Sequence, residues 1–185
     1  MKTSLTGRSR EETTKLAYDL GFEYLEAAIC PQAAFAALQD VFQFRDDTVF
    51  RSLTGFLGGG GDTCLGACGG LVGGVAAISY LFGRSRTEFD YKIWDLSLRV
   101  LVKKLFDGFA AEFGGIRCRD VHEKMFGRTF DLFDKEQEKL FLETIEKDSR
   151  GGCSYPVAVA SSLAAGVIWD ELHNPNRVRE DLYTY

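Results

Sequence analysis

Residues 63–83 read TCLGACGGLVGGVAAISYLFG and contain no charged side chain. A run of this length passes the minimum for a membrane span, which is about 18 apolar residues. Its residues are mostly glycine, alanine, serine, cysteine and valine, so its hydrophobicity is modest. The other predicted helices have charged faces suited to water, and a helix that is apolar all round can be the centre of a bundle. We therefore predict a buried central helix and no membrane insertion.

Glycines recur along this stretch at the spacing of one helical turn. Glycine inside a helix costs about 1 kcal/mol relative to alanine, so a repeated pattern needs a structural reason. One reason is close helix packing, because missing side chains let two backbones approach. Another is room for a bulky cofactor or a second subunit, and the two reasons are compatible. The two smooth stripes consist of Gly66, Gly70 and Gly74, and of Gly69 and Gly73.

The rest of the chain has helical signals and no convincing strand alternation. Ser9 and Glu12 form a capping-box pattern at the start of a first helix that extends to about Ala28. Asp62 and Thr87 are expected to cap the glycine-rich helix and a long amphipathic helix. The sequence predicts an all-α, single-domain bundle of about six or seven helices over residues 1–173, followed by a C-terminal tail, 174–185. The other predicted helices cover about residues 33–44, 87–113, 135–147 and 156–173, with short helical pieces at about 47–53 and 118–126.

The composition of the 185-residue chain limits its function classes. The net charge is −5, from 22 Lys and Arg against 27 Asp and Glu, which argues against non-specific binding of nucleic acid. The first residues, MKTSLTGR, contain no apolar segment of a secretory signal, so we expect a cytoplasmic protein. In a reducing compartment, widely spaced cysteines are more typical of metal ligands or redox thiols than of structural disulfides.

The sequence has five cysteines, and each is at a break or helix start marked by glycine or proline. Free N–H groups and the positive dipole end of a helix N-terminus stabilise a thiolate and lower its pKa. This placement predicts reactive or metal-ligating sulfur, although cysteines also commonly fill core space. Apart from Cys64 and Cys68, their separations are far longer than the compact pairs of zinc fingers and ferredoxins, so the fold would have to assemble a shared site. The five are Cys30, Cys64, Cys68, Cys118 and Cys153.

Two pairs of candidate ligands are separated by one helical turn. Cys64 and Cys68 would share a helix face, and with it a metal or redox site, if the helix is regular there. Cys118 and His122 have the same separation, but we expect His122 to be a surface or structural histidine rather than a ligand. The sequence has no phosphate-binding or haem-attachment motif, so neither a nucleotide nor an attached haem is predicted.

Several of these segments together resemble one known family. Residues 30–35 read CPQAAF, residues 68–73 read CGGLVG after a glycine-rich turn, and Cys118 and Cys153 follow. In this order they resemble the C_GCAxxG_C_C family of redox-active proteins, which is marked by four cysteines and a Cys-Gly-Ala-x-x-Gly motif. The resemblance covers most of the chain. The departures are Gly70 in place of the motif alanine and Cys64 as an extra cysteine just before the motif.

The resemblance implies an all-helical module that binds an iron–sulfur cluster, since a similar domain occurs in the split-Soret cytochromes. We favour a 2Fe–2S over a 4Fe–4S cluster, and a role in electron transfer or as a redox subunit of a larger complex. A metal-free thiol–disulfide redox protein and a subunit with structural zinc are the alternatives, and whether the chain is an enzyme is left open. By analogy, we expect a homodimer or a redox complex. The implied cluster and metal ligands are Cys30, Cys68, Cys118 and Cys153, with Cys64 as an additional candidate.

Overall fold

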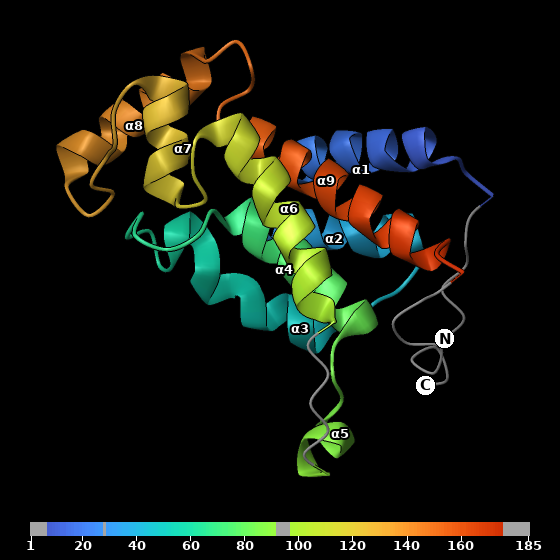
Figure 1. Ribbon diagram of the computed structural model, residues 1–185. Coiled ribbons are helices and arrows are strands. Elements are labelled where there is room, and N and C mark those ends of the chain that lie inside the picture. The colour runs from blue at the N-terminus through green and yellow to red at the C-terminus, as the bar shows by residue number, and fades with distance from the viewer. Residues whose placement is uncertain (1–6, 28, 92–96, 176–185) are drawn as a thin grey trace.

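The glycine-rich stretch forms helix α4, Gly69–Phe82, which packs between α2, Cys30–Phe42, and α9, Ser154–Leu172 (Figure 1). The computed structural model describes residues 7–27, 29–91 and 97–175. Helix α4 has 14 residues, fewer than the roughly 20 that a membrane span needs. Among the described residues, no helix is both long and apolar enough to cross a membrane.

The other helices surround this core. They are α1 (Arg10–Tyr24), α3 (Asp47–Ser52), the 3₁₀ segment η1 (Leu53–Gly59), α5 (Arg86–Asp90), α6 (Leu98–Phe113), α7 (Cys118–Phe126) and α8 (Lys135–Lys147). Helix α1 packs against α9 and α2, and α6 packs against α4 and α9. Helices α7 and α8 lie together at one end of the core, whereas α5 projects away from it at the bottom of Figure 1. The described residues form no strand, which confirms the all-α prediction.

The core consists mainly of apolar side chains from α4 and from the three helices α2, α6 and α9 that pack against it. Burying one such side chain completely stabilises the fold by about 1.5–3 kcal/mol relative to leaving it exposed. Aromatic rings of α2 and α6 supply much of the volume, and aliphatic side chains of α4 and α9 fill the space between them. The largest fully buried ones are Phe35, Leu38, Leu71, Ile78, Leu105, Phe109, Phe113 and Ile168.

Local capping signals determine where several helices begin. The Ser9 N–H donates to a Glu12 carboxylate oxygen at 2.8 Å, and the Glu12 N–H donates to Ser9 Oγ at 3.2 Å, which confirms the capping box. Asp46 and Asp134 cap α3 and α8 with their carboxylates. Helix α1 ends at Tyr24, before the expected Ala28, which lies outside the described residues.

The start of the central helix differs from the prediction. Helix α4 begins at Gly69, with Cys68 as its N-cap residue. Asp62 and Cys64 have φ angles of 60° and 58°, in the left-handed region, which interrupts a right-handed helix. The prediction that Asp62 caps this helix is therefore wrong, and Cys64 and Cys68 do not share a helix face.

The long helix predicted from Thr87 to Phe113 is also interrupted. Its first part is the short helix α5, in which Ser85 rather than Thr87 is the N-cap residue and forms a capping box with Glu88. Helix α5 ends at Asp90 and α6 begins at Leu98, while residues 92–96 lie outside the described part of the chain. The same holds for residues 176–185 of the predicted tail.

The helical glycines face other helices of the same chain. A Cβ on Gly73 would lie 2.8 Å from the Cβ of Ala34 in α2, and a Cβ on Gly70 would lie 2.9 Å from the Cα of Val157 in α9. Real Cβ atoms do not approach so closely, so these positions require glycine. Close helix packing is thus confirmed for these glycines, whereas Gly66 lies in the loop before α4.

We predict that Gly73→Ala destabilises the protein by about 1–3 kcal/mol, because the added methyl group would overlap the carbonyl oxygen of Pro31. Gly55→Ala is the matched control, since a Cβ there has no heavy atom within 4 Å. Urea denaturation followed by circular dichroism gives both free energies of unfolding. Helix propensity alone favours alanine by about 1 kcal/mol, so an unchanged or more stable Gly73→Ala protein would contradict the packing argument.

Candidate functional site

Four cysteines stand at the starts of four helices. Cys30 and Cys118 are the first residues of α2 and α7, and Cys68 and Cys153 are the N-cap residues of α4 and α9. The predicted placement at helix starts is therefore confirmed. All four cysteines line one cavity of about 160 Å³. The fold thus brings cysteines that are far apart in the sequence to a single place.

A short antiparallel pairing joins residues 64–68, before α4, to residues 116–119 at the start of α7. We call it the backbone clamp. In the middle of it, the Cys118 N–H donates to the Gly66 carbonyl oxygen at 3.0 Å. The clamp holds Cys64 beside α7 although this residue belongs to no helix.

Glycines make room for the cysteines on two sides of the cavity. Residues 58–61 are four glycines with positive φ angles. A Cβ on Gly59 would lie 2.9 Å from the Cβ of Cys118, so this position requires glycine for its conformation and for its lack of a side chain. A Cβ on Gly69 would overlap Cys30 Sγ. Side chains at these positions would displace the cysteines.

Burial controls the pKa values of three cavity thiols. It raises the pKa of Cys30 and of Cys153, and it raises the pKa of Cys68 to about 12. Backbone N–H groups act in the opposite direction, as Gly58 does on Cys30 and Gly70 on Cys68. The lowered pKa expected at helix starts is therefore wrong for these thiols, because loss of water around the thiolate outweighs the hydrogen bonds.

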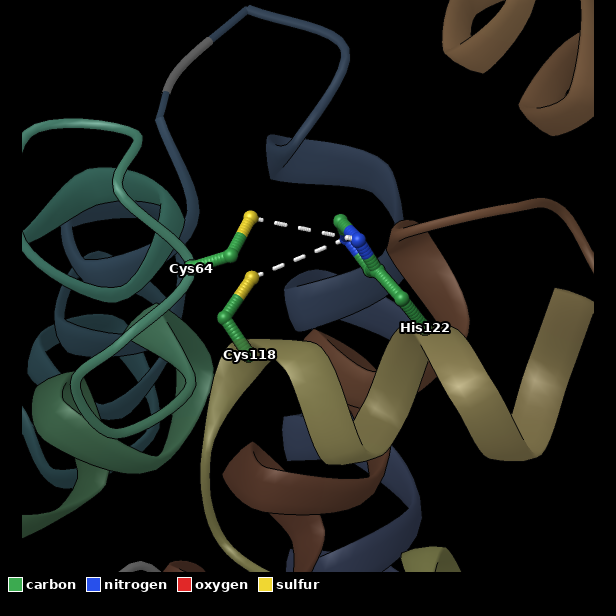
Figure 2. Close-up of side chains that lie close together, drawn as sticks. All are labelled: Cys64, Cys118 and His122. Carbon is green, nitrogen blue, oxygen red and sulfur yellow. Dashed lines mark hydrogen bonds between the residues drawn. The ribbon is translucent and has the colours of Figure 1, made fainter. Parts of the chain in front are cut away.

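Three buried residues form a second, more compact group beside the cavity (Figure 2). Cys118 Sγ lies 3.6 Å from Nε2 of His122, and Cys64 Sγ lies 4.0 Å from Nδ1 of the same ring. One ligand atom from each of the three residues can be chosen so that all three atoms lie within 4.8 Å of one another. Cys64 comes from the backbone clamp, and the other two residues are one turn apart on α7. We call them the Cys–Cys–His group.

His122 is buried, with 2% of its surface exposed, so the expectation of a surface position is wrong. Its ring contacts three aromatic rings, which agrees with a structural histidine. Its two nitrogens face sulfur atoms, which sequence reasoning missed because one of these sulfurs comes from a distant loop. The signal available in the sequence was that His122 follows Cys118 by four residues, which is about one helical turn. The aromatic rings are those of Phe126, Phe130 and Phe141, with centroids 5.7, 5.7 and 5.0 Å away.

The two thiols of this group lie close together and move each other's pKa values in opposite directions. The Cys118 thiol lowers the pKa of Cys64, which His122 lowers further although burial opposes it. The Cys64 thiol and burial raise the pKa of Cys118.

The two arrangements of ligands differ in their spacing. In the described part of the chain, the Cys–Cys–His group is the only set of three or more potential metal ligands whose atoms all lie within 4.8 Å. The four cavity cysteines are therefore spread more widely. A single tetrahedral ion with metal–sulfur bonds of about 2.3 Å needs sulfur atoms only about 3.8 Å apart. The compact group thus suits one ion, and the wider set suits a larger group.

A comparison with protein families identifies the chain. The sequence model of one family, described as "Putative redox-active protein (C_GCAxxG_C_C)", matches residues 28–166, well over half of the chain. The chain belongs to the C_GCAxxG_C_C family. No curated protein and no solved structure matched it. Membership of the C_GCAxxG_C_C family and the Cys–Cys–His group together support a redox role.

The cavity relates directly to the C_GCAxxG_C_C pattern. The cysteines that line it are those that we matched to the family's four cysteines in the sequence. Cys64, the extra cysteine, does not line this cavity and belongs to the Cys–Cys–His group. Cys118 and His122 belong to this group and also line the cavity, so the two sets adjoin and Cys64 alone lies outside the cavity.

We predict that mild oxidation of the metal-free protein joins Cys64 to Cys118 before any other pair of cysteines. The oxidant diamide takes one hydrogen atom from each thiol, and the backbone clamp holds the two sulfur atoms within 4.8 Å of each other. Alkylation of the remaining thiols in denaturant and mass-spectrometric peptide mapping identify the first disulfide. A Cys64→Ala protein is the control and should form its first disulfide more slowly. A first disulfide between Cys30 and Cys153 would contradict this arrangement.

Proposed function

We propose that this member of the C_GCAxxG_C_C family is an iron–sulfur redox protein that transfers electrons, alone or as a subunit of a larger complex. The observation that carries the proposal is the cavity shared by Cys30, Cys68, Cys118 and Cys153. Cysteine thiolates are the usual ligands of iron–sulfur clusters. The wide spacing of the four sulfurs supports a polynuclear group rather than one ion.

The surroundings of the cavity suit a negatively charged cluster. The backbone amide of Gly58 lowers the pKa of Cys30 and that of Gly70 lowers the pKa of Cys68, so both amides favour negative charge on sulfur. Such N–H···S bonds stabilise the added negative charge of a reduced cluster and therefore raise its reduction potential. Apolar side chains such as Phe141 line the cavity and limit the access of water.

Asp62 adds an opposing electrostatic effect. Its side chain lines the same cavity, and burial raises the pKa of its carboxyl group above the ordinary value. In its ionised form, this carboxylate disfavours the extra electron of a reduced cluster and lowers the potential. A bound cluster would supply one-electron transfer, and the chain would set its potential through these amides, this carboxylate and the apolar wall.

We propose a 2Fe–2S rather than a 4Fe–4S cluster on the basis of the family resemblance. The iron and sulfide content per chain distinguishes the two types. The contact between Cys64 and Cys118 favours a second candidate function, a metal-free thiol–disulfide redox protein. That function requires two thiols that cycle with oxidant and reductant in iron-free protein, which thiol titration measures. A homodimer or a redox complex is also proposed, and sedimentation analysis tests the homodimer.

We predict that protein prepared without oxygen contains iron and acid-labile sulfide in equal amounts and absorbs visible light through sulfur-to-iron charge transfer. Its reduced form should give the electron paramagnetic resonance signal of an iron–sulfur cluster. Cys30→Ala and Cys153→Ala should each lose most of the iron, because each removes one of four ligands. Both residues are only partly buried, so these substitutions disturb the core less than a change at Cys68.

Cys64→Ala is the matched control, because this cysteine does not line the cavity and the variant should keep its iron and sulfide. Circular dichroism shows whether each variant is folded. Anaerobically prepared protein without iron would overturn the proposal. Full iron content in both Cys30→Ala and Cys153→Ala would also overturn it.

A further inference from the structure

We propose that Cys64, Cys118 and His122 form a binding site for a single soft divalent ion such as Zn²⁺ at the edge of the four-cysteine cavity, which Cys118 and His122 also line. Both sulfurs and one nitrogen of His122 lie within 4.8 Å of one another, which is close to the separation of ligands on one ion. Metal–ligand bonds of about 2.0–2.3 Å in tetrahedral geometry place neighbouring ligand atoms about 3.5–3.8 Å apart. Small side-chain rotations are therefore sufficient to bring the three atoms onto one ion.

The environment of His122 gives independent support. Its ring is buried among aromatic side chains, where a polar group without good hydrogen bonds costs free energy. In the described part of the chain, the recorded polar contacts of its two nitrogens are the sulfurs of Cys64 and Cys118. Both contacts are weak, because sulfur is a poor hydrogen-bond donor and acceptor. A metal ion would satisfy one nitrogen with a strong bond and both sulfurs at the same time.

The Cys–Cys–His group lies between the protein surface and the cavity. Cys64 lines a surface hollow of about 380 Å³ together with Leu65, Arg119 and Phe130. Cys118 and His122 do not line this hollow and line the four-cysteine cavity instead. Three protein ligands leave one tetrahedral position open, as in catalytic rather than structural zinc sites. Water or a small ligand would occupy that position.

Cys118 connects this site to the proposed cluster. It lines the cavity and also belongs to the Cys–Cys–His group. A Cys118 thiolate bound to an ion beside His122 is not available as the fourth ligand in the cavity. The two occupancies therefore exclude one another, and this part of the inference rests on the proposed iron–sulfur function. The mononuclear site itself does not rest on it.

The site is tested with Co²⁺ as a spectroscopic probe, added to the reduced, metal-free, full-length protein. We expect one equivalent to bind, with sulfur-to-cobalt charge-transfer absorption and the visible bands of tetrahedral cobalt. Cys64→Ala and His122→Gln should each weaken binding by about 100-fold or more, since loss of a direct ligand exceeds the 10–100-fold effect of losing a supporting contact. Cys30→Ala and Cys153→Ala are matched controls and should bind Co²⁺ as the unmodified protein does.

The variants separate this site from the alternatives. Binding that is lost in Cys30→Ala and Cys153→Ala but kept in Cys64→Ala and His122→Gln would place the ion in the cavity and overturn the inference. Absence of Co²⁺ binding to the unmodified protein would also overturn it. Because Cys64 lies in a loop, Cys64→Ala should fold even if His122→Gln disturbs α7. Circular dichroism shows whether each variant is folded.

The exclusion is tested by reconstitution with iron and sulfide after loading with Zn²⁺. Zinc should block cluster formation in the unmodified protein but not in Cys64→Ala. Undiminished cluster formation in zinc-loaded, unmodified protein would overturn the sharing of Cys118. If no cluster forms even without zinc, the proposed iron–sulfur function fails, while the cobalt result still decides the mononuclear site.

Discussion

The close approach of the α4 backbone to α2 and α9 determines where the cysteines meet. Gly73 lets α4 contact α2, and Gly70 lets it contact α9. All three helices have their N-terminal ends at the same cavity, so Cys30, Cys68 and Cys153 converge there. Larger side chains on α4 would push the helices apart, and the three sulfurs would move apart with them. Helix packing and the arrangement of the site thus depend on the same missing side chains.

The parts of the fold that could be predicted are those with signals inside one helical turn. Ser9 and Glu12 define a helix start because a capping box involves only neighbouring residues. The cysteines at helix starts were recognisable because glycine or proline marks those junctions. The central position of α4 followed from its lack of charge. Family resemblance, rather than spacing, indicated that four of the cysteines belong together.

The features that could not be predicted depend on contacts between distant residues. The left-handed backbone of Cys64 is held by pairing with the start of α7, which no local pattern indicates. Cys64 is also the residue outside α7 whose sulfur contacts His122. The pKa values of the cavity thiols required knowledge of burial, because local amides alone suggested the opposite direction for Cys68. In each case tertiary structure decided between local alternatives.

The glycine loop at residues 58–61 gives one side of the cavity an unusual property. Gly58 lines the cavity and Gly59 lies against Cys118, so this side consists of main chain rather than side chains. Point mutations therefore have no side chain to exchange there, and any addition changes the shape. A change in the charge or polarity of the cavity is therefore expected at positions that have side chains, such as Asp62 and Phe141, which also line the cavity. The four sulfurs thus share their cavity with a stretch of main chain that tolerates no side chain and with side chains that can be exchanged.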